Sequence, residues 1–258
     1  MIHEVLAAAF LLGLTGLIVA VPMHAWNRTS FTLPQYVLFC LVKCIVRIQW
    51  GARISPLPFR KGQGVVLICN HRSSVDPMFI GTAMSWPGHW MVAKEYCQHP
   101  AFGWFLRMAE VIPTNRAGVD TAATKMAIRY AAQGEVVGML PEGRINISQE
   151  FMMPARPGAI LVALKAKVPI VPFYIENAPY AGTVWSPFFM RARVRVVVGQ
   201  PIDLSAYFDR ELSSEELRAL TLQCLRGIAS LAGRDDFEPK IAGRQWKPTD
   251  AKIGRAHV

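Results

Sequence analysis

The sequence predicts an α/β fold in which a mixed, mostly parallel sheet carries helices on both faces. Short apolar runs alternate along the chain with longer segments of helical periodicity. The runs are apolar at nearly every position, as expected of strands buried on both sides. With 258 residues, 52% of them hydrophobic, the chain is long enough for one large core or for a domain with an anchor.

The predicted elements follow one another after residue 50. The expected strands are 65–69, 135–140, 168–175 and 193–199, and the expected helices are 77–85, 99–108, 119–133, 158–167 and 213–231. Gly134 should end the third of these helices, because glycine is favoured just after the last helical residue. Ser213 should open the last helix, since a serine followed by glutamates is typical of a helix N-terminus.

The N-terminus predicts a membrane anchor. Residues Val5–Met23 carry no charge, and a helix of this length spans about 28 Å, close to the thickness of a bilayer core. A cleaved signal peptide is the alternative, since residues 23–25 loosely resemble a cleavage site, but no Lys or Arg precedes the apolar run. Arg28, Lys43 and Arg47 follow it, so the positive-inside bias places the main domain on the cytoplasmic side of the membrane.

A second apolar segment, Phe31–Trp50, is interrupted by Pro34 and two cations. It is either a helix lying in the membrane interface or an ordinary amphipathic helix packed on the domain. The chain is therefore expected to divide into an N-terminal membrane segment at 1–50, a catalytic domain at 51–233 and a loose tail at 234–258.

The composition indicates which kinds of binding partner to expect. The formal net charge of +10 favours anionic partners such as phosphate compounds or the cytoplasmic leaflet. No zinc spacing, RNA-binding aromatic signature or helix-turn-helix pattern is evident, so no nucleic acid is expected. The five cysteines include no C-x-x-C pair, which fits a reducing compartment. Arg191, Arg193 and Arg195 alternate with apolar residues and form either a solvated strand face or a basic surface for a phosphate compound.

Residues 69–77, Cys-Asn-His-Arg-Ser-Ser-Val-Asp-Pro, follow directly on an expected strand. In a parallel sheet, functional groups gather outside the carboxyl ends of the strands. A strand-to-helix reversal can bring His71 and Asp76 together, so that the carboxylate holds one imidazole nitrogen and leaves the other free to accept a proton. The spacing leaves a second interpretation open, because Asp76 before Pro77 is also a good helix cap and His71 can be a turn residue.

Four sequence blocks, taken in order, resemble the glycerolipid acyltransferase family. Residues 70–77 are similar to its N-H-x4-D block, 94–116 to its second motif, Leu140–Gly143 to its third and 168–172 to its fourth. The similarity covers roughly residues 60–200 and implies the α/β fold of that family.

The resemblance implies transfer of a fatty acyl group from acyl-CoA or acyl carrier protein to the hydroxyl of a lysophospholipid. The first expected acceptor is 1-acylglycerol-3-phosphate, which gives phosphatidic acid, and neither a metal nor an organic cofactor is implied. Another lysolipid acceptor and a non-catalytic lipid-binding membrane protein remain alternatives. A metal-dependent phosphate-ester hydrolase is disfavoured, because the sequence offers no His, Asp and Glu cluster with ligand spacing.

The resemblance also implies roles for individual residues. His71 would be the general base and Asp76 would orient it. Arg116 would hold the acceptor phosphate, unless it is a surface salt-bridge residue. Glu142 and Gly143 would line the acceptor site, although a solvated loop carboxylate is the alternative for Glu142 taken alone.

The sequence departs from the family pattern in three places, the last of which covers two adjacent positions. Leu140 replaces the usual phenylalanine, and Glu110 stands where glycine is common. Arg144 directly follows Gly143, where a small hydroxyl residue is usual, and Ile145 takes the usual arginine position. The charge of a bound phosphate favours an Arg144 that still faces the acceptor; the alternative is an arginine that points to solvent or pairs with Glu150.

Overall fold

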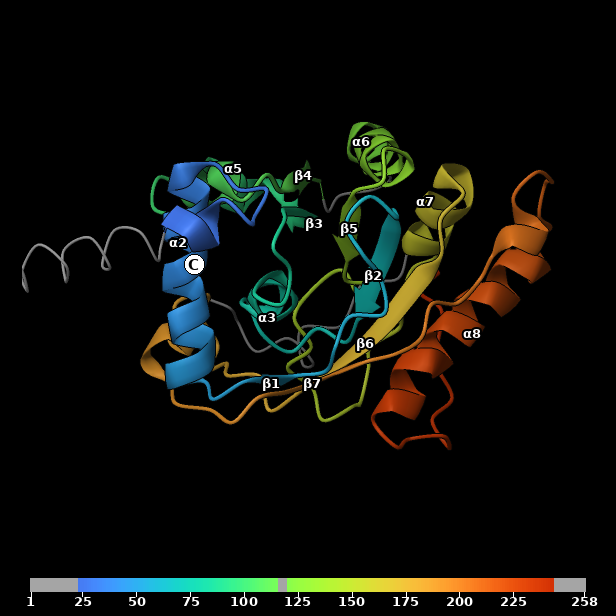
Figure 1. The fold of residues 1–258 in the computed structure, drawn as a ribbon. Helices are drawn as coiled ribbons and strands as arrows, with labels where there is room; N and C mark the ends of the chain where they lie inside the picture. Colours follow the sequence, from blue (N-terminus) through green and yellow to red (C-terminus); the bar gives the residue numbers. More distant parts are fainter. Residues whose placement is uncertain (1–22, 116–119, 244–258) are drawn as a thin grey trace, which may run out of the picture.

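A seven-stranded sheet forms the centre of the computed structural model, which describes residues 23–115 and 120–243 (Figure 1). The strands are β1 (Arg53–Ile54), β2 (Val65–Cys69), β3 (Gly88–Ala93), β4 (Ile112–Thr114), β5 (Val136–Met139), β6 (Ile170–Glu176) and β7 (Arg195–Val198). Their order across the sheet is β1-β7-β6-β2-β5-β3-β4. Every neighbouring pair is parallel except β6 and β7, so the predicted mixed, mostly parallel sheet is confirmed.

Helices cover both faces of this sheet, as predicted. They are α2 (Leu33–Cys44), the π-helix η1 (Ile45–Gln49), α3 (Asp76–Gly81), α4 (Lys94–Gln98), α5 (Gly103–Met108), α6 (Thr121–Ala132), α7 (Gly158–Ala166), the 3₁₀-helices η2 (Ser186–Phe189) and η3 (Ser205–Tyr207), and α8 (Ser214–Leu231). In Figure 1, α6, α7 and α8 lie on one side of the strands, and α2 and α3 lie on the other.

Strand β2 shows how one run of apolar residues serves two cores. Val66 and Ile68 belong to a cluster formed with α6, α7 and α8. Val65 and Leu67 point the other way, because successive side chains of a strand alternate between faces, and they join a cluster with η1 and α3. Full burial contributes roughly 1.5–3 kcal/mol for each such side chain, so β2 is anchored from both sides.

Several helix boundaries differ from the sequence prediction. The helix expected at 77–85 is the shorter α3, and the one expected at 99–108 is α5 alone, preceded by a separate α4. The capping predictions hold for α8, where Ser213 Oγ accepts from Glu216 N–H and the Glu216 carboxylate accepts from Ser213 N–H. Gly134 adopts a φ of 88° just past α6, a conformation that favours glycine.

Strand β3 is absent from the predicted elements. It begins with a glycine and a histidine, so it lacks the continuous apolar run that identified the other central strands. Trp90 of β3 lies directly over Gly138 of β5, where the Cβ of any larger residue would come within 2.3 Å of the indole ring. Glycine at 138 therefore makes room for a large aromatic side chain in the middle of the sheet.

The end of the N-terminal segment is packed into the main domain, although its sequence suggests a separate unit. Within residues 23–115 and 120–243, no helix combines the length and the apolar character needed to cross a membrane. The predicted anchor at Val5–Met23 lies, except for its last residue, outside the described residues. The segment 31–50 contains α2 followed by η1, whose Val46 and the adjacent Trp50 are fully buried. The main core therefore begins before residue 51.

The tail predicted at 234–258 is packed in its first part. Ala155 N–H donates to the Lys240 carbonyl, and Ala242 N–H donates to the Ala155 carbonyl. Phe237 packs edge-on against Phe151, with ring centroids 5.0 Å apart. Residues 234–243 thus close over the end of the domain, and 244–258 lie outside the described residues.

Candidate active site

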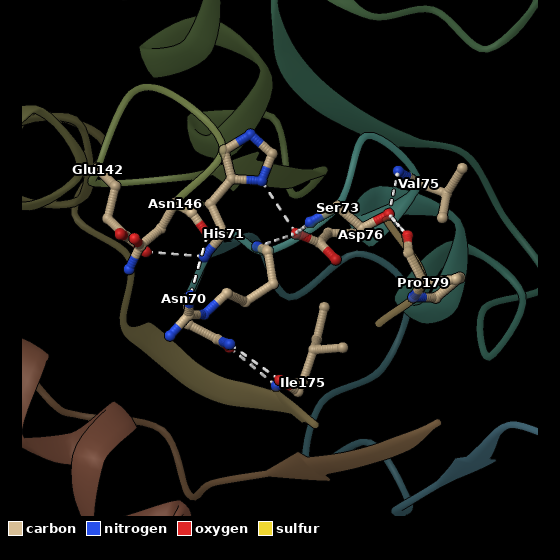
Figure 2. A network of polar contacts seen from close by, with 10 residues as sticks. Asn70, His71, Ser73, Val75, Asp76, Glu142, Asn146, Ile175 and Pro179 are labelled. Atoms are coloured by element: carbon tan, nitrogen blue, oxygen red, sulfur yellow. Dashed lines mark hydrogen bonds and ion pairs between the residues drawn. The ribbon is translucent and has the colours of Figure 1, made fainter. Parts of the chain in front are cut away.

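The residues between β2 and α3 form a tight turn around one carboxylate (Figure 2). Asp76 Oδ2 lies 2.8 Å from the backbone nitrogen of Arg72 and 2.9 Å from that of Ser73. The same oxygen lies 2.9 Å from Nδ1 of His71. Asp76 is in the first turn of α3 with Pro77 behind it, so the helix start directs the carboxylate back into the turn. The predicted meeting of His71 and Asp76 is therefore present.

This contact determines what the imidazole can do. Because Oδ2 already accepts two backbone N–H groups, it acts as an acceptor, and Nδ1 of His71 carries the proton. The neutral ring then presents Nε2 as its proton acceptor, and Figure 2 shows this nitrogen directed away from Asp76. The Asp76 side chain is fully buried, whereas 12% of the His71 side chain remains exposed. The pair has the arrangement of a general base and its orienting partner.

Two further residues of the turn, which sequence reasoning did not single out, fix it to β6 and the segment after it. The Asn70 side-chain amide donates to the Ile175 carbonyl and accepts from the Ile175 N–H, both at 2.9 Å. Ser73 Oγ donates to the Pro179 carbonyl at 2.6 Å. Asn70 and Ser73 are buried, and the signal that could have identified them is their polarity directly after a buried strand.

Glu142 lies beside the base in a turn after β5. Its Oε1 accepts from His71 N–H and its Oε2 accepts from Met153 N–H, each at 2.8 Å. The residue is only 4% exposed, so it is not a solvated carboxylate. Burial raises the pKa of Glu142 to about 7, against the opposing effects of the two N–H groups and of Arg72. Gly143 is exposed, with a φ of 71° that favours glycine at this turn.

Of the two arginines predicted to bind phosphate, the structure describes only Arg144. Arg144 is half-buried in the loop that follows Gly143. Arg116 lies outside the described residues, and its neighbour Asn115 follows the carboxyl end of β4. Because β2 and β4 run in the same direction, Asn115 leaves the sheet at the edge that also carries His71.

Glu110, one of the departures from the family pattern, has a structural consequence. Its φ is 53°, a left-handed conformation that explains why glycine is common at this position. The Glu110 carboxylate accepts a hydrogen bond from the Gln35 side chain at 2.8 Å, and the same amide donates to the Met108 carbonyl. In this protein the side chain at position 110 thus connects the domain to α2.

Sequence comparisons agree with the predicted resemblance. A sequence model of the family described as Acyltransferase matches residues 55–176. The chain is 28% identical over 204 residues to 1-acyl-sn-glycerol-3-phosphate acyltransferase of Bacillus subtilis, which covers 77% of this chain and 98% of the relative. The enzyme of the same name from Streptococcus pneumoniae is 29% identical over 147 residues, covering 55% of this chain and 52% of the relative. The chain thus matches nearly all of the first relative and about half of the second.

A solved structure shares the fold. The crystal structure of the 1-acyl-sn-glycerophosphate (LPA) acyltransferase from Thermotoga maritima matches with a TM-score of 0.58 at 18% sequence identity. The match covers 90% of this chain and 96% of the other. The sequence blocks, the family model, the relatives and the fold agree with one another: residues 55–176 match the acyltransferase family model, and the chain is an acyltransferase similar to the 1-acyl-sn-glycerol-3-phosphate acyltransferases.

Proposed function

We propose that this enzyme transfers a fatty acyl group from acyl-CoA or acyl carrier protein to the hydroxyl of a lysophospholipid. The first candidate acceptor is 1-acylglycerol-3-phosphate, which would give phosphatidic acid. The observation that carries the proposal is the 2.9 Å contact between Nδ1 of His71 and Asp76, which leaves Nε2 as a proton acceptor at the carboxyl edge of the sheet. The names of the bacterial relatives support the choice of acceptor.

The proposed reaction needs no nucleophile of the protein. Nε2 of His71 takes the proton of the acceptor hydroxyl as its oxygen attacks the thioester carbonyl carbon. The tetrahedral intermediate collapses when the carbon–sulfur bond breaks, and the imidazolium returns the proton to the departing thiolate. Asp76 stabilises the imidazolium in between. Base catalysis of this kind typically contributes ~10²–10⁴-fold in rate, and no step calls for a metal or an organic cofactor.

The proposed acceptor phosphate is held by Arg116 and Arg144. A phosphate monoester offers several oxygens, and a planar guanidinium can donate two parallel hydrogen bonds to them. Because Arg144 and Ile145 replace the usual residues of the third motif, an acceptor with another head group is the second candidate. Comparing lysophosphatidate, glycerol-3-phosphate and neutral lysolipids with a single acyl-CoA separates these candidates.

We propose that the enzyme works at a membrane, with its catalytic domain on the cytoplasmic side. Leu33, Val37 and Leu41 of α2 are each more than half exposed, and their spacing of four places them on one face of the helix. None of the twelve residues of α2 is buried, which supports the interfacial interpretation over a helix packed fully on the domain. Lys43 and Arg47 follow this face and can reach anionic head groups.

Two experiments test the proposal. Purified enzyme should release free thiol from acyl-CoA only when a lysophospholipid is present, and His71→Ala should lower this release to a small residual rate, at most a few per cent of the wild type, while remaining folded. Thiol release without an acceptor would indicate a hydrolase, and more than a few per cent of residual turnover in His71→Ala would refute the base assignment. For the anchor, full-length protein should stay with carbonate-washed membranes and a variant lacking residues 1–22 should not.

A further inference from the structure

The backbone of His71 is held on both sides by the segment that follows β5. Its N–H donates to Glu142 Oε1 at 2.8 Å, and its carbonyl accepts from Asn146 N–H at 2.7 Å (Figure 2). The first contact comes from a side chain and the second from the backbone four residues later. The peptide groups that carry the imidazole are therefore fixed by residues about seventy positions further along the chain.

Glu142 is a bridge with both oxygens engaged. Its second oxygen accepts from Met153 N–H, so the carboxylate connects the base to the far end of the same loop. The residue is 4% exposed. Its negative charge would repel an acceptor phosphate, and its buried position gives it no open face toward one. These features separate Glu142 from a residue that binds the substrate.

Arg72, the residue after the base, also forms hydrogen bonds with the loop that follows Glu142. The Arg72 guanidinium donates to the backbone carbonyls of Asn146, Ser148 and Glu150 at 3.0, 2.7 and 2.6 Å. Hydrogen bonds in both directions thus join residues 142–153 to the pair His71–Arg72. The Glu142 carboxylate accepts from the His71 backbone, and the Arg72 guanidinium donates to the backbone of the loop.

We propose that Glu142 is a positioning residue that fixes the direction of the His71 imidazole through its backbone N–H. This inference rests on the proposed role of His71 as the general base. The physical reason is geometric, because a displacement of about 1 Å at a reacting group can cost on the order of 10²-fold in rate. A carboxylate that spans two N–H groups resists such a displacement better than a side chain with a single acceptor oxygen.

The ionisation of Glu142 adds a second consequence. Burial and the nearby Asp76 raise its pKa, the N–H groups of His71 and Met153 and the charge of Arg72 lower it, and the balance is about 7. Protonation converts one acceptor oxygen into a hydroxyl, which cannot accept as well from the N–H that faces it. The hydrogen bond from His71 N–H to the Glu142 side chain should therefore weaken as the pH falls below about 7.

The test compares Glu142→Gln with Glu238→Gln, the same chemical change at a side chain that is 80% exposed and paired with Arg226. Glutamine has a single acceptor oxygen and can satisfy only one of the two N–H groups. With lysophosphatidate and an acyl-CoA, we expect kcat to fall by on the order of 10²-fold in Glu142→Gln. KM for lysophosphatidate should stay within about twofold, and Glu238→Gln should match the wild type.

A double-mutant cycle separates action through His71 from a direct role. In the His71→Ala background, Glu142→Gln should have no further effect on the residual rate. A rise in KM for lysophosphatidate with unchanged kcat would make Glu142 a substrate ligand and overturn the proposal. A lower melting temperature with wild-type kcat would show a purely structural role and would also overturn it.

Glu142→Asp provides the second variant if the glutamine protein fails to fold. Its carboxylate keeps the charge but is one methylene too short to span both N–H groups, so the same loss of kcat at unchanged KM is expected. Wild-type kcat in a folded Glu142→Asp would refute the proposal. Failure of the base assignment itself would appear separately, as activity retained in His71→Ala.

Discussion

Replacing Asp76 with asparagine should slow acyl transfer by roughly 30-fold while the turn stays folded. Asp76 Oδ2 accepts from the N–H groups of Arg72 and Ser73 as well as from the ring. Two backbone donors at that point favour an oxygen and exclude an amide NH2. The asparagine NH2 should therefore take the place of Oδ1, which has no hydrogen-bond partner among the described residues. The imidazole keeps its Nδ1–H tautomer.

What the substitution removes is the negative charge that faces the imidazolium. Two full charges about 4 Å apart interact by about 4 kcal/mol at an effective dielectric constant of about 20. If about half of the charge has developed on the ring in the transition state, about 2 kcal/mol of stabilisation is lost. At about 1.4 kcal/mol for each factor of ten, this corresponds to a rate roughly 30-fold lower.

Asp76→Ala provides the contrast, because it removes the oxygen as well as the charge. The backbone N–H groups of Arg72 and Ser73 then lose their acceptor, at roughly 1–3 kcal/mol for each donor left buried and unpaired. Thiol release at saturating substrates measures kcat, and thermal unfolding measures stability. Wild-type kcat in Asp76→Asn, or wild-type stability in Asp76→Ala, would refute this account of the turn.

Three other predictions concern the acceptor, the membrane and pH. Arg144→Ala should raise KM for lysophosphatidate well above its effect on KM for acyl-CoA, and unchanged acceptor kinetics would make Arg144 a surface residue. Replacing Val37 and Leu41 with serine should reduce co-sedimentation with anionic vesicles, whereas undiminished binding would exclude this face of α2. Because the pKa of Glu142 is raised from 4.5 to about 7, the folded protein retains a proton that the unfolded chain loses between these values. The free energy of unfolding should therefore fall by about 3 kcal/mol across that window as the pH rises, and Glu142→Gln should flatten the slope in thermal unfolding.

The sequence predicted the elements whose patterns are complete within themselves. Strands β2 and β6 are continuous apolar runs, and α8 carries its own capping residues, so each could be identified without its neighbours. Strand β3 could not, because its place in the sheet depends on Trp90 packing over Gly138 of another strand. Strand β3 is stabilised by tertiary contacts, and its local sequence contains little that would indicate a strand.

The candidate site divides in the same way. The meeting of His71 and Asp76 could be predicted because both lie in one turn, five residues apart. The contact between Glu142 and the His71 backbone joins residues 71 positions apart, and no local spacing encodes it. For Glu142 the family resemblance identified an important residue but not the groups that it contacts.

The order of strands explains how these distant residues meet. Strand β2 lies between β5 and β6, and all three run in the same direction. Their carboxyl ends are therefore adjacent at one edge of the sheet. His71 follows β2 at this edge, and Glu142 follows β5. The carbonyls that accept from Asn70 and Ser73 belong to β6 and to the segment after it. A base in a turn has little rigidity of its own. Here the turn is fixed by neighbours on both flanks, so a substitution beyond either flanking strand can change catalysis without touching the substrate.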